Sequence, residues 1–210
     1  MKKGLFITVE GGDGSGKTTQ LAFIRGFLEE RGEDVLYTRE PGGTPIGERI
    51  REIILDKDHP EMDAMTETLL YAASRAQIVS EVIKPALAEG RTVVCDRYVD
   101  SSIAYQGYGR ELGESVAVIN GYAVQDCMPD LTILLLVDPE EGRQRLADRP
   151  LDRLEQEGLS FHDKVYQGYQ ALAEQFPDRI RAIDGTMEVA SVSREIAKAL
   201  QEALDRRDDL

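Results

Sequence analysis

The chain has few cysteines and no long apolar run. Its two cysteines, Cys95 and Cys127, lack C-x-x-C spacing, so we expect buried free thiols and not a disulfide or a metal pair. No apolar stretch approaches the roughly 20 residues that cross a bilayer. The N-terminus "MKKGLFITVEGGDG" reaches acid and glycines too early for a signal peptide. We therefore expect a cytoplasmic protein without a membrane partner.

Positive charge is also scarce. Lys and Arg number 25 against 39 Asp and Glu, which gives a formal net charge of −14. An acidic surface repels a phosphate backbone, so we do not expect nucleic acid as a partner. Hydrophobic residues make up 41% of the chain, and no tract is of low complexity. These properties predict a globular protein, with residues 1–210 forming one domain.

Five short β-rich runs alternate with helical stretches along the chain. They are "LFITVE" (5–10), "DVLYT" (34–38), "TVVCD" (92–96), "LTILLLVD" (131–138) and "IRAID" (180–184). This alternation predicts an α/β fold, with a five-stranded parallel sheet covered by helices on both faces and a ligand crevice at the carboxyl ends of the strands. Apolar residues in steps of three and four, from Met65 to Leu87, predict one long helix that could also face a partner subunit.

The stretch "EGGDGSGKTT" follows the first run directly and matches the phosphate-binding pattern G-x-x-x-x-G-K-[ST]. Glycines let backbone N–H groups converge on phosphates, Lys17 reaches the β- and γ-phosphates, and Thr18 coordinates Mg²⁺. We therefore expect ATP to bind the loop residues Gly11, Gly12, Asp13, Gly14, Ser15, Gly16, Lys17, Thr18 and Thr19.

Mg²⁺ also needs an acidic partner, which usually ends a neighbouring strand. Two aspartates compete for this position, Asp96 in "TVVCDRY" and Asp138 in "LTILLLVDPEEG". Asp138 precedes Pro139 and two glutamates, a pattern typical of a helix N-cap. We therefore assign the metal role to Asp96, together with Thr18.

The loop contains no arginine, although phosphoryl transfer develops negative charge that a cation must stabilise. Arg145, Arg149 and Arg153 recur every four residues and would share one face of a helix. A salt-bridged surface helix is the competing interpretation, since Glu141 and Arg145 have ion-pair spacing. We expect a short lid over residues 142–158 that delivers Arg149 or Arg153 to the phosphates.

Four segments, in order, carry a family resemblance: "FITVEGGDGSGKTTQ", "YTREPGGTPIGERIRE", "DRYVDSSIAYQGYGR" and "PLDRLEQE". The chain resembles bacterial thymidylate kinases over nearly its whole length. The resemblance implies the P-loop nucleoside monophosphate kinase fold, phosphorylation of dTMP to dTDP by ATP with Mg²⁺, and a homodimer. It also places the chain with the members whose catalytic arginine lies in the lid.

The same resemblance implies roles for individual residues. Catalytic roles fall on Asp13, Lys17, Arg97 and a lid arginine, Arg149 or Arg153. Tyr71 would stack on thymine, Arg75 would bind its exocyclic oxygen, and Tyr105 would sense the missing 2′-hydroxyl. The full set implied for the acceptor is Glu40, Arg51, Tyr71, Arg75, Arg97, Ser101, Ser102, Tyr105 and Gln106.

Two other functions are weighed against this one. A nucleotide-dependent switch is disfavoured because no [NT]-K-x-D guanine-reading motif follows any strand. A related kinase that uses another acceptor, such as dUMP, dCMP or a nucleoside, stays open at this stage, since a serine in the base-reading segment does not by itself establish base choice.

Overall fold

A computed structural model describes residues 4–146 and 150–208, and residues 1–3, 147–149 and 209–210 lie outside this description. The described residues contain a five-stranded parallel sheet with strand order β2-β3-β1-β4-β5. The strands are β1 (Phe6–Gly11), β2 (Val35–Arg39), β3 (Thr92–Asp96), β4 (Leu131–Leu136) and β5 (Ile180–Asp184). The predicted strands and the predicted sheet are confirmed.

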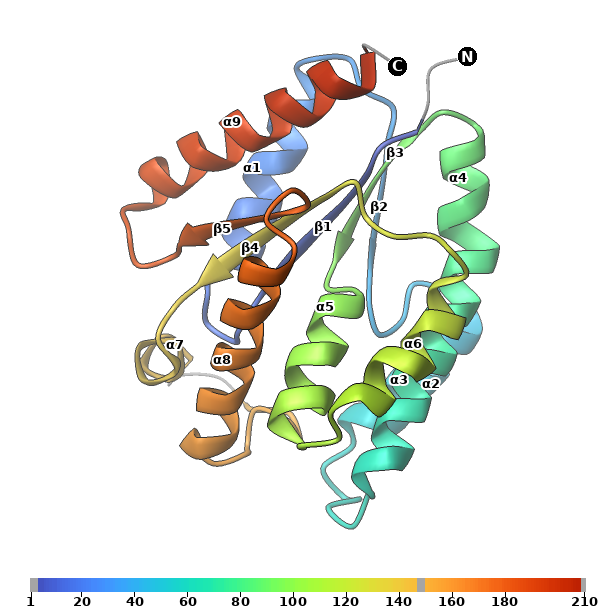
Figure 1. Ribbon diagram of the computed structural model, residues 1–210, viewed down its shortest axis with the longest axis vertical. Helices are drawn as coiled ribbons and strands as arrows, with labels where there is room; N and C mark the ends of the chain where they lie inside the picture. Colours follow the sequence, from blue (N-terminus) through green and yellow to red (C-terminus); the bar gives the residue numbers. More distant parts are fainter. Residues whose placement is uncertain (1–3, 147–149, 209–210) are drawn as a thin grey trace.

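Two helices, α1 (Lys17–Glu29) and α9 (Val189–Asp208), cover one face of the sheet, and Figure 1 shows them together at the upper left. Their apolar stripes, which include Ile24, Leu28 and Ile196, bury against Ile7 and Ile133 of the two central strands. Because successive residues of a strand point to opposite faces, the neighbouring positions of β1 and β4 face the other layer. Helix α1 begins directly at the phosphate-binding loop, so its packing fixes the position of that loop.

The remaining helices lie on the opposite face, except α7, which lies at the carboxyl end of β4 (Figure 1). They are α2 (Pro45–Leu55), α3 (Ala64–Ile78), the π-helical turn η1 (Val79–Ile83), α4 (Lys84–Ala88), α5 (Val99–Ser102), the π-helical turns η2 (Ile103–Gly109), α6 (Glu114–Val124), α7 (Pro139–Arg145) and α8 (Leu159–Gln175). The long helix predicted from Met65 to Leu87 is confirmed as α3, η1 and α4. The wider turn η1 precedes Pro85, which has no amide hydrogen to donate to the preceding turn.

Two smaller expectations are also confirmed. Both cysteines are free and buried in the described structure, Cys95 in β3 and Cys127 after α6. Asp138 caps α7, since its side chain accepts a hydrogen bond of 2.9 Å from the backbone N–H of Glu140. No helix within residues 4–146 and 150–208 is both long and apolar enough to cross a membrane.

The expectation that Arg145 and Arg153 share one helix face is wrong. Helix α7 ends at Arg145, and the residues from Pro150 to Glu157 form turns and irregular chain. A proline inside a helix removes a hydrogen bond and clashes with the preceding turn, which fits the irregular chain that the structure shows from Pro150 onward. Arg149 lies outside the described residues, so its predicted role stays a prediction.

Candidate active site

The phosphate-binding loop links the end of β1 to the start of α1, at the carboxyl edge of the sheet. Gly14 and Gly16 adopt positive φ angles of 76° and 93°, which glycine reaches without strain. The ammonium of Lys17 donates to the carbonyl oxygens of Gly11 and Gly12, each at 2.9 Å. The Lys17 side chain therefore folds back onto the start of the loop.

The charge of Lys17 is sensitive to its surroundings. Burial, together with the nearby guanidinium of Arg97, lowers its pKa to about 8, while Asp13 and Asp96 oppose the shift. A phosphate group beside the ammonium would favour the charged form and raise this pKa. The loop is thus suited to binding a polyanion at near-neutral pH.

Helix α7 rests directly on this loop. A Cβ atom on Gly142 would lie 2.5 Å from the carbonyl oxygen of Asp13, and one on Gly14 would lie 2.1 Å from the carbonyl oxygen of Gly142. Real Cβ atoms do not come so close to backbone atoms. Glycine is therefore needed at both position 14 and position 142 for α7 to lie this near the loop. The base of the expected lid is consequently part of the wall around the phosphate-binding loop.

Arg145, at the end of α7, reaches the loop, whereas Arg153, the other lid arginine among the described residues, does not. Its guanidinium donates to the carbonyl oxygens of Gly14, at 3.3 Å, and Gly185, at 3.2 Å. It also pairs with Glu141 at 2.6 Å, so the predicted i to i+4 ion pair forms. Arg145 lines one cleft together with Lys17, Thr18 and other loop residues.

Asp96 ends β3 and faces the same cleft as Thr18. Its Oδ1 atom is buried without a hydrogen-bond partner among the described residues. A buried carboxylate oxygen is costly unless something compensates its charge. Hard oxygen ligands of this kind suit Mg²⁺, which binds through one or two protein oxygens and the phosphates of its nucleotide. The two residues therefore fit the predicted metal site.

Asp13 joins the loop to a second pocket. Arg97 donates to its Oδ1 at 2.6 Å, and the Tyr105 hydroxyl donates to its Oδ2 at 2.9 Å. Burial would raise the pKa of Asp13, but Arg97, Lys17 and the Tyr105 hydrogen bond outweigh it and hold the pKa below its ordinary value. Asp13 is thus an ionised carboxylate held between the loop and the second pocket.

Arg97 has an unusual backbone, with a φ angle of 65°. Non-glycine residues rarely adopt this conformation, and it persists where the surrounding contacts hold it. The guanidinium also donates to the carbonyl oxygen of Gly11 at 3.0 Å and to the Ser101 hydroxyl at 3.2 Å. A cation is thereby fixed between the two clefts.

The second pocket lies between α2, α3, α5 and η2. Of the residues predicted to bind the acceptor, it is lined by Glu40, Arg51, Tyr71, Arg97, Ser101, Ser102, Tyr105 and Gln106. Arg51 and Arg97 line both this pocket and the loop cleft, as do Asp13 and Asp96. Two cavities that share charged walls at one edge of the sheet can bring two anionic ligands together.

Arg75 does not line this pocket but lies behind its wall. Its guanidinium, 1% exposed, pairs with Glu40 at 2.6 Å and donates to the Ser102 hydroxyl at 2.9 Å. A third hydrogen bond runs to the side-chain oxygen of Asn120. Its Nε atom has no partner among the described residues. The predicted contact between Arg75 and the acceptor base therefore stays a prediction.

Arg153 faces away from the phosphate-binding loop. Its side chain donates to the carbonyl oxygen of Ile54 at 2.8 Å and pairs with Glu67 at 2.7 Å. Its neighbours Asp152 and Leu154 line the acceptor pocket, and Asp152 lines the loop cleft as well. In this structure Arg153 joins the segment after α7 to α2 and α3, and its predicted catalytic role stays untested.

Sequence reasoning missed two residues beneath the site, Glu10 and Tyr169. The Glu10 carboxylate accepts hydrogen bonds from the backbone N–H of Tyr98 at 2.7 Å and the Ser101 hydroxyl at 2.5 Å. The Tyr169 hydroxyl lies 2.9 Å from the Ser101 hydroxyl. Burial, helped by the charge of Asp100, raises the pKa of Glu10 to about 7. Glu10 holds Tyr98 and Ser101 in place beneath the site. The one sequence signal for this role is a charged residue at the end of an otherwise apolar strand.

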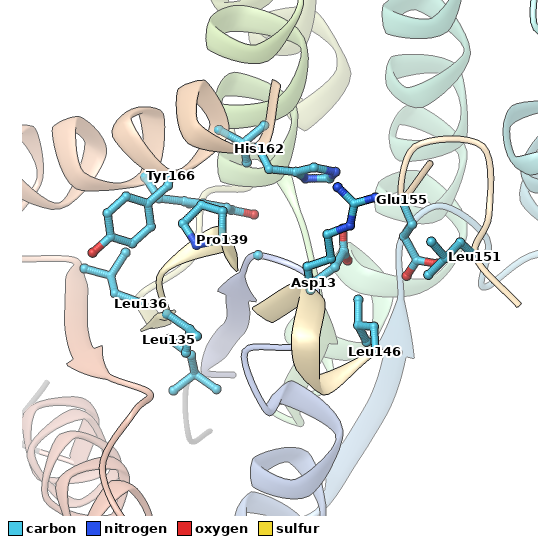
Figure 2. Close-up of a pocket in the computed structure, with 14 residues that line it drawn as sticks. Asp13, Leu135, Leu136, Pro139, Leu146, Leu151, Glu155, His162 and Tyr166 are labelled. Carbon is cyan, nitrogen blue, oxygen red and sulfur yellow. The ribbon is translucent and has the colours of Figure 1, made fainter. Parts of the chain in front are cut away.

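An apolar cavity lies on the other side of Asp13, between α7, α8 and the end of β4. Figure 2 shows Leu135, Leu136 and Tyr166 on one side of it and Leu146 and Leu151 on the other. His162 and Glu155 are its polar neighbours, with Asp13 at its edge. Asp13 therefore separates an apolar cavity from the polar acceptor pocket.

Comparisons with known proteins show the family of this chain. The sequence profile of the thymidylate kinase family matches residues 9–196. The chain is 48% identical over 208 residues to the thymidylate kinase of Halalkalibacterium halodurans, covering 97% of this chain and 99% of that protein. It is 50% identical over 211 residues to the thymidylate kinase of Exiguobacterium sibiricum, covering 99% of each.

A solved structure is also similar. The crystal structure of thymidylate kinase from Ehrlichia chaffeensis aligns with a TM-score of 0.76 and 32% identity, covering 94% of this chain and 99% of that one. The similarity of fold agrees with the family profile. This chain therefore belongs to the thymidylate kinase family.

Proposed function

We propose that this kinase transfers the γ-phosphoryl group of ATP to the phosphate of dTMP and forms dTDP. One observation carries the proposal: the cleft at the phosphate-binding loop and the acceptor pocket meet at Asp13 and Arg97. A donor phosphate held by the loop and an acceptor phosphate held by Arg97 would face each other across that junction. Fixing two reactants in this way makes the transfer effectively intramolecular.

On the donor side, the loop residues Gly11 to Thr19 would bind the phosphates of ATP through their backbone N–H groups, with Lys17 as the counter-charge. Arg145 adds a cation at the same cleft. Thr18 and Asp96 would hold Mg²⁺, which supplies electrostatic stabilisation of the phosphate oxygens when bound. A cation from the lid, Arg149 or Arg153, completes the predicted set.

On the acceptor side, Tyr71 would stack on the base, while Gln106 and Ser102 would read its polar edge. Arg51 and Arg97 would hold the acceptor phosphate. Tyr105, fixed on Asp13 at 2.9 Å, fills the space where a 2′-hydroxyl would lie and favours a deoxyribose. We infer a cytoplasmic location from these substrates and from the two free thiols.

A coupled assay with ATP and Mg²⁺ tests the proposed function against a panel of nucleoside monophosphates. We expect dTMP to give the highest kcat/KM among dTMP, dUMP, dCMP, dAMP and dGMP. The preference follows from a pocket with fixed donors and acceptors, which rejects bases that leave those groups unpaired. A higher kcat/KM for any other member of the panel would overturn the assignment of the acceptor.

We also propose a homodimer in which α3 and α6 meet the same helices of a second copy. These neighbouring helices carry apolar side chains that are largely exposed, Leu69 at 51%, Val118 at 61% and Tyr122 at 82%. Apolar clusters of this kind on a surface mark interaction sites. We expect light scattering to give about twice the chain mass of 23.4 kDa, a monomer mass being the contrary result.

A further inference from the structure

A group of charged side chains lies behind Gln106, a residue that lines the acceptor pocket, and it is centred on Glu67 in the first turns of α3. The Glu67 carboxylate is fully buried, and it pairs with Arg110 at 3.0 Å and with Arg153 at 2.7 Å. Arg110 also pairs with Glu157 at 2.6 Å. Two carboxylates thus balance two guanidiniums, with Glu67 and Arg153 buried and Arg110 and Glu157 partly exposed to solvent.

Gln106 completes this group from the turns of η2. Its Nε2 atom donates to Glu67 Oε1 at 2.8 Å, and the residue is 1% exposed. A side-chain amide has one donor end and one acceptor end, whereas an ionised carboxylate only accepts. The Glu67 carboxylate therefore determines which end of the Gln106 amide faces it.

The charge state of Glu67 supports this orientation. Burial would raise its pKa, but hydrogen bonds from Arg110, Gln106 and Arg153 outweigh burial and lower the pKa below its ordinary value. Glu67 consequently stays ionised at neutral pH and cannot donate to an inverted amide. An inverted Gln106 would place its oxygen against the carboxylate, where neither atom carries a hydrogen.

The other end of the amide is available to a ligand. Gln106 lines the acceptor pocket, and its Oε1 atom has no hydrogen-bond partner among the described residues. We propose that Glu67 is a positioning residue that fixes Gln106 with its carbonyl oxygen free for the acceptor, and so selects a pyrimidine with an N–H at position 3. This inference rests on the proposed function, and it names the group that sets base choice.

The hydrogen-bonding groups of the bases determine which pyrimidines Gln106 would favour. Thymine and uracil both carry a hydrogen on N3, which Oε1 can accept, whereas cytosine presents a lone pair there. Two opposed acceptors leave both groups unpaired in a buried site, and sites built on such pairing discriminate strongly. Glu67 therefore disfavours dCMP through Gln106, without contacting the base. It does not distinguish dTMP from dUMP, because both bases carry a hydrogen on N3.

The test compares kcat/KM for dTMP, dUMP and dCMP in Glu67→Gln and in the wild-type chain. A glutamine at position 67 can donate or accept, so the Gln106 amide is free to invert. We expect the ratio of dTMP to dCMP to fall about 10-fold or more, with the ratio of dTMP to dUMP unchanged. A variant that is folded and keeps the wild-type ratio of dTMP to dCMP would overturn the inference.

Two further variants separate positioning from general loosening. Arg110→Gln removes another partner of Glu67 and leaves the Gln106 contact in place, so its ratio of dTMP to dCMP should match the wild type. The exchange E67Q/Q106E keeps the charge of the group and puts an obligate acceptor at position 106. The exchange should restore preference for dTMP over dCMP, and a persistent loss of preference would contradict the proposed role.

Wild-type measurements keep the two proposals distinct. Absence of dTMP turnover in the wild-type chain would refute the proposed function itself. Normal dTMP turnover, combined with an unaltered ratio in Glu67→Gln, would refute only the role of Glu67.

Discussion

Lys17→Ala is expected to lower kcat for phosphoryl transfer at least about 1,000-fold, on the scale of losing a cation from a phosphoryl-transfer site. The physical reason is that the partly buried Lys17 ammonium lies at the loop, bonded to the Gly11 and Gly12 carbonyl oxygens at 2.9 Å. The measurement is kcat for dTMP phosphorylation at saturating ATP.

Lys57→Ala provides the matched control, because Lys57 is an exposed lysine in the turn after α2. Its kcat should equal that of the wild type. Thermal unfolding of Lys17→Ala should show an intact fold, since the substitution also removes a buried charge. Turnover within about 10-fold of the wild type in a folded Lys17→Ala would contradict the role given to this lysine.

Gly142→Ala is expected to lower kcat/KM for ATP about 100-fold, because displacements near 1 Å at a catalytic site have effects of this size. The added Cβ would lie 2.5 Å from the Asp13 carbonyl oxygen, a distance that backbone must relieve by moving. Helix α7 would then shift away from the loop and carry Arg145 with it. Steady-state kinetics with ATP as the varied substrate measures the effect.

Gly26→Ala in α1 is the control for this substitution, since a Cβ at Gly26 would meet nothing within 4 Å. Alanine inside a helix is more favourable than glycine by about 1 kcal/mol, so this variant should be as active as the wild type and slightly more stable. Equal kcat/KM for ATP in Gly142→Ala and Gly26→Ala would show that the glycine contact does not matter.

Much of the fold could be predicted because its signals are local. The β-branched run before the loop, the Lys-Thr pair after Gly16 and the Asp138–Pro139 cap each report on residues close in the chain. The Cys95 and Cys127 thiols followed from composition in the same way. Alternation of such segments then limits the topology to a parallel sheet with helices on both faces.

The pairings inside the site could not be predicted, since they join residues distant in the sequence. Arg153 meets Glu67 across 86 positions, and Arg75 of α3 meets Glu40, which directly follows β2. Spacing reveals a charge but not its partner, which explains why the lid arginines were expected on one face. Arg145 ends a helix, whereas Arg153 lies in a turn that follows Pro150. The four-residue spacing of the arginines does not reveal this change of structure, although a proline disfavours a helix that runs through it.

The position of Asp13 has a consequence for inhibitor chemistry. A compound in the acceptor pocket meets mainly charged and polar walls, so much of its binding energy is offset by desolvation. The apolar cavity in Figure 2 begins directly beyond Asp13, where Leu135 and Tyr166 form its lining. A substituent that passes this carboxylate would bury apolar surface worth roughly 25 cal/mol per Å². A substrate-like inhibitor that is extended past Asp13 into the apolar cavity would thus gain affinity.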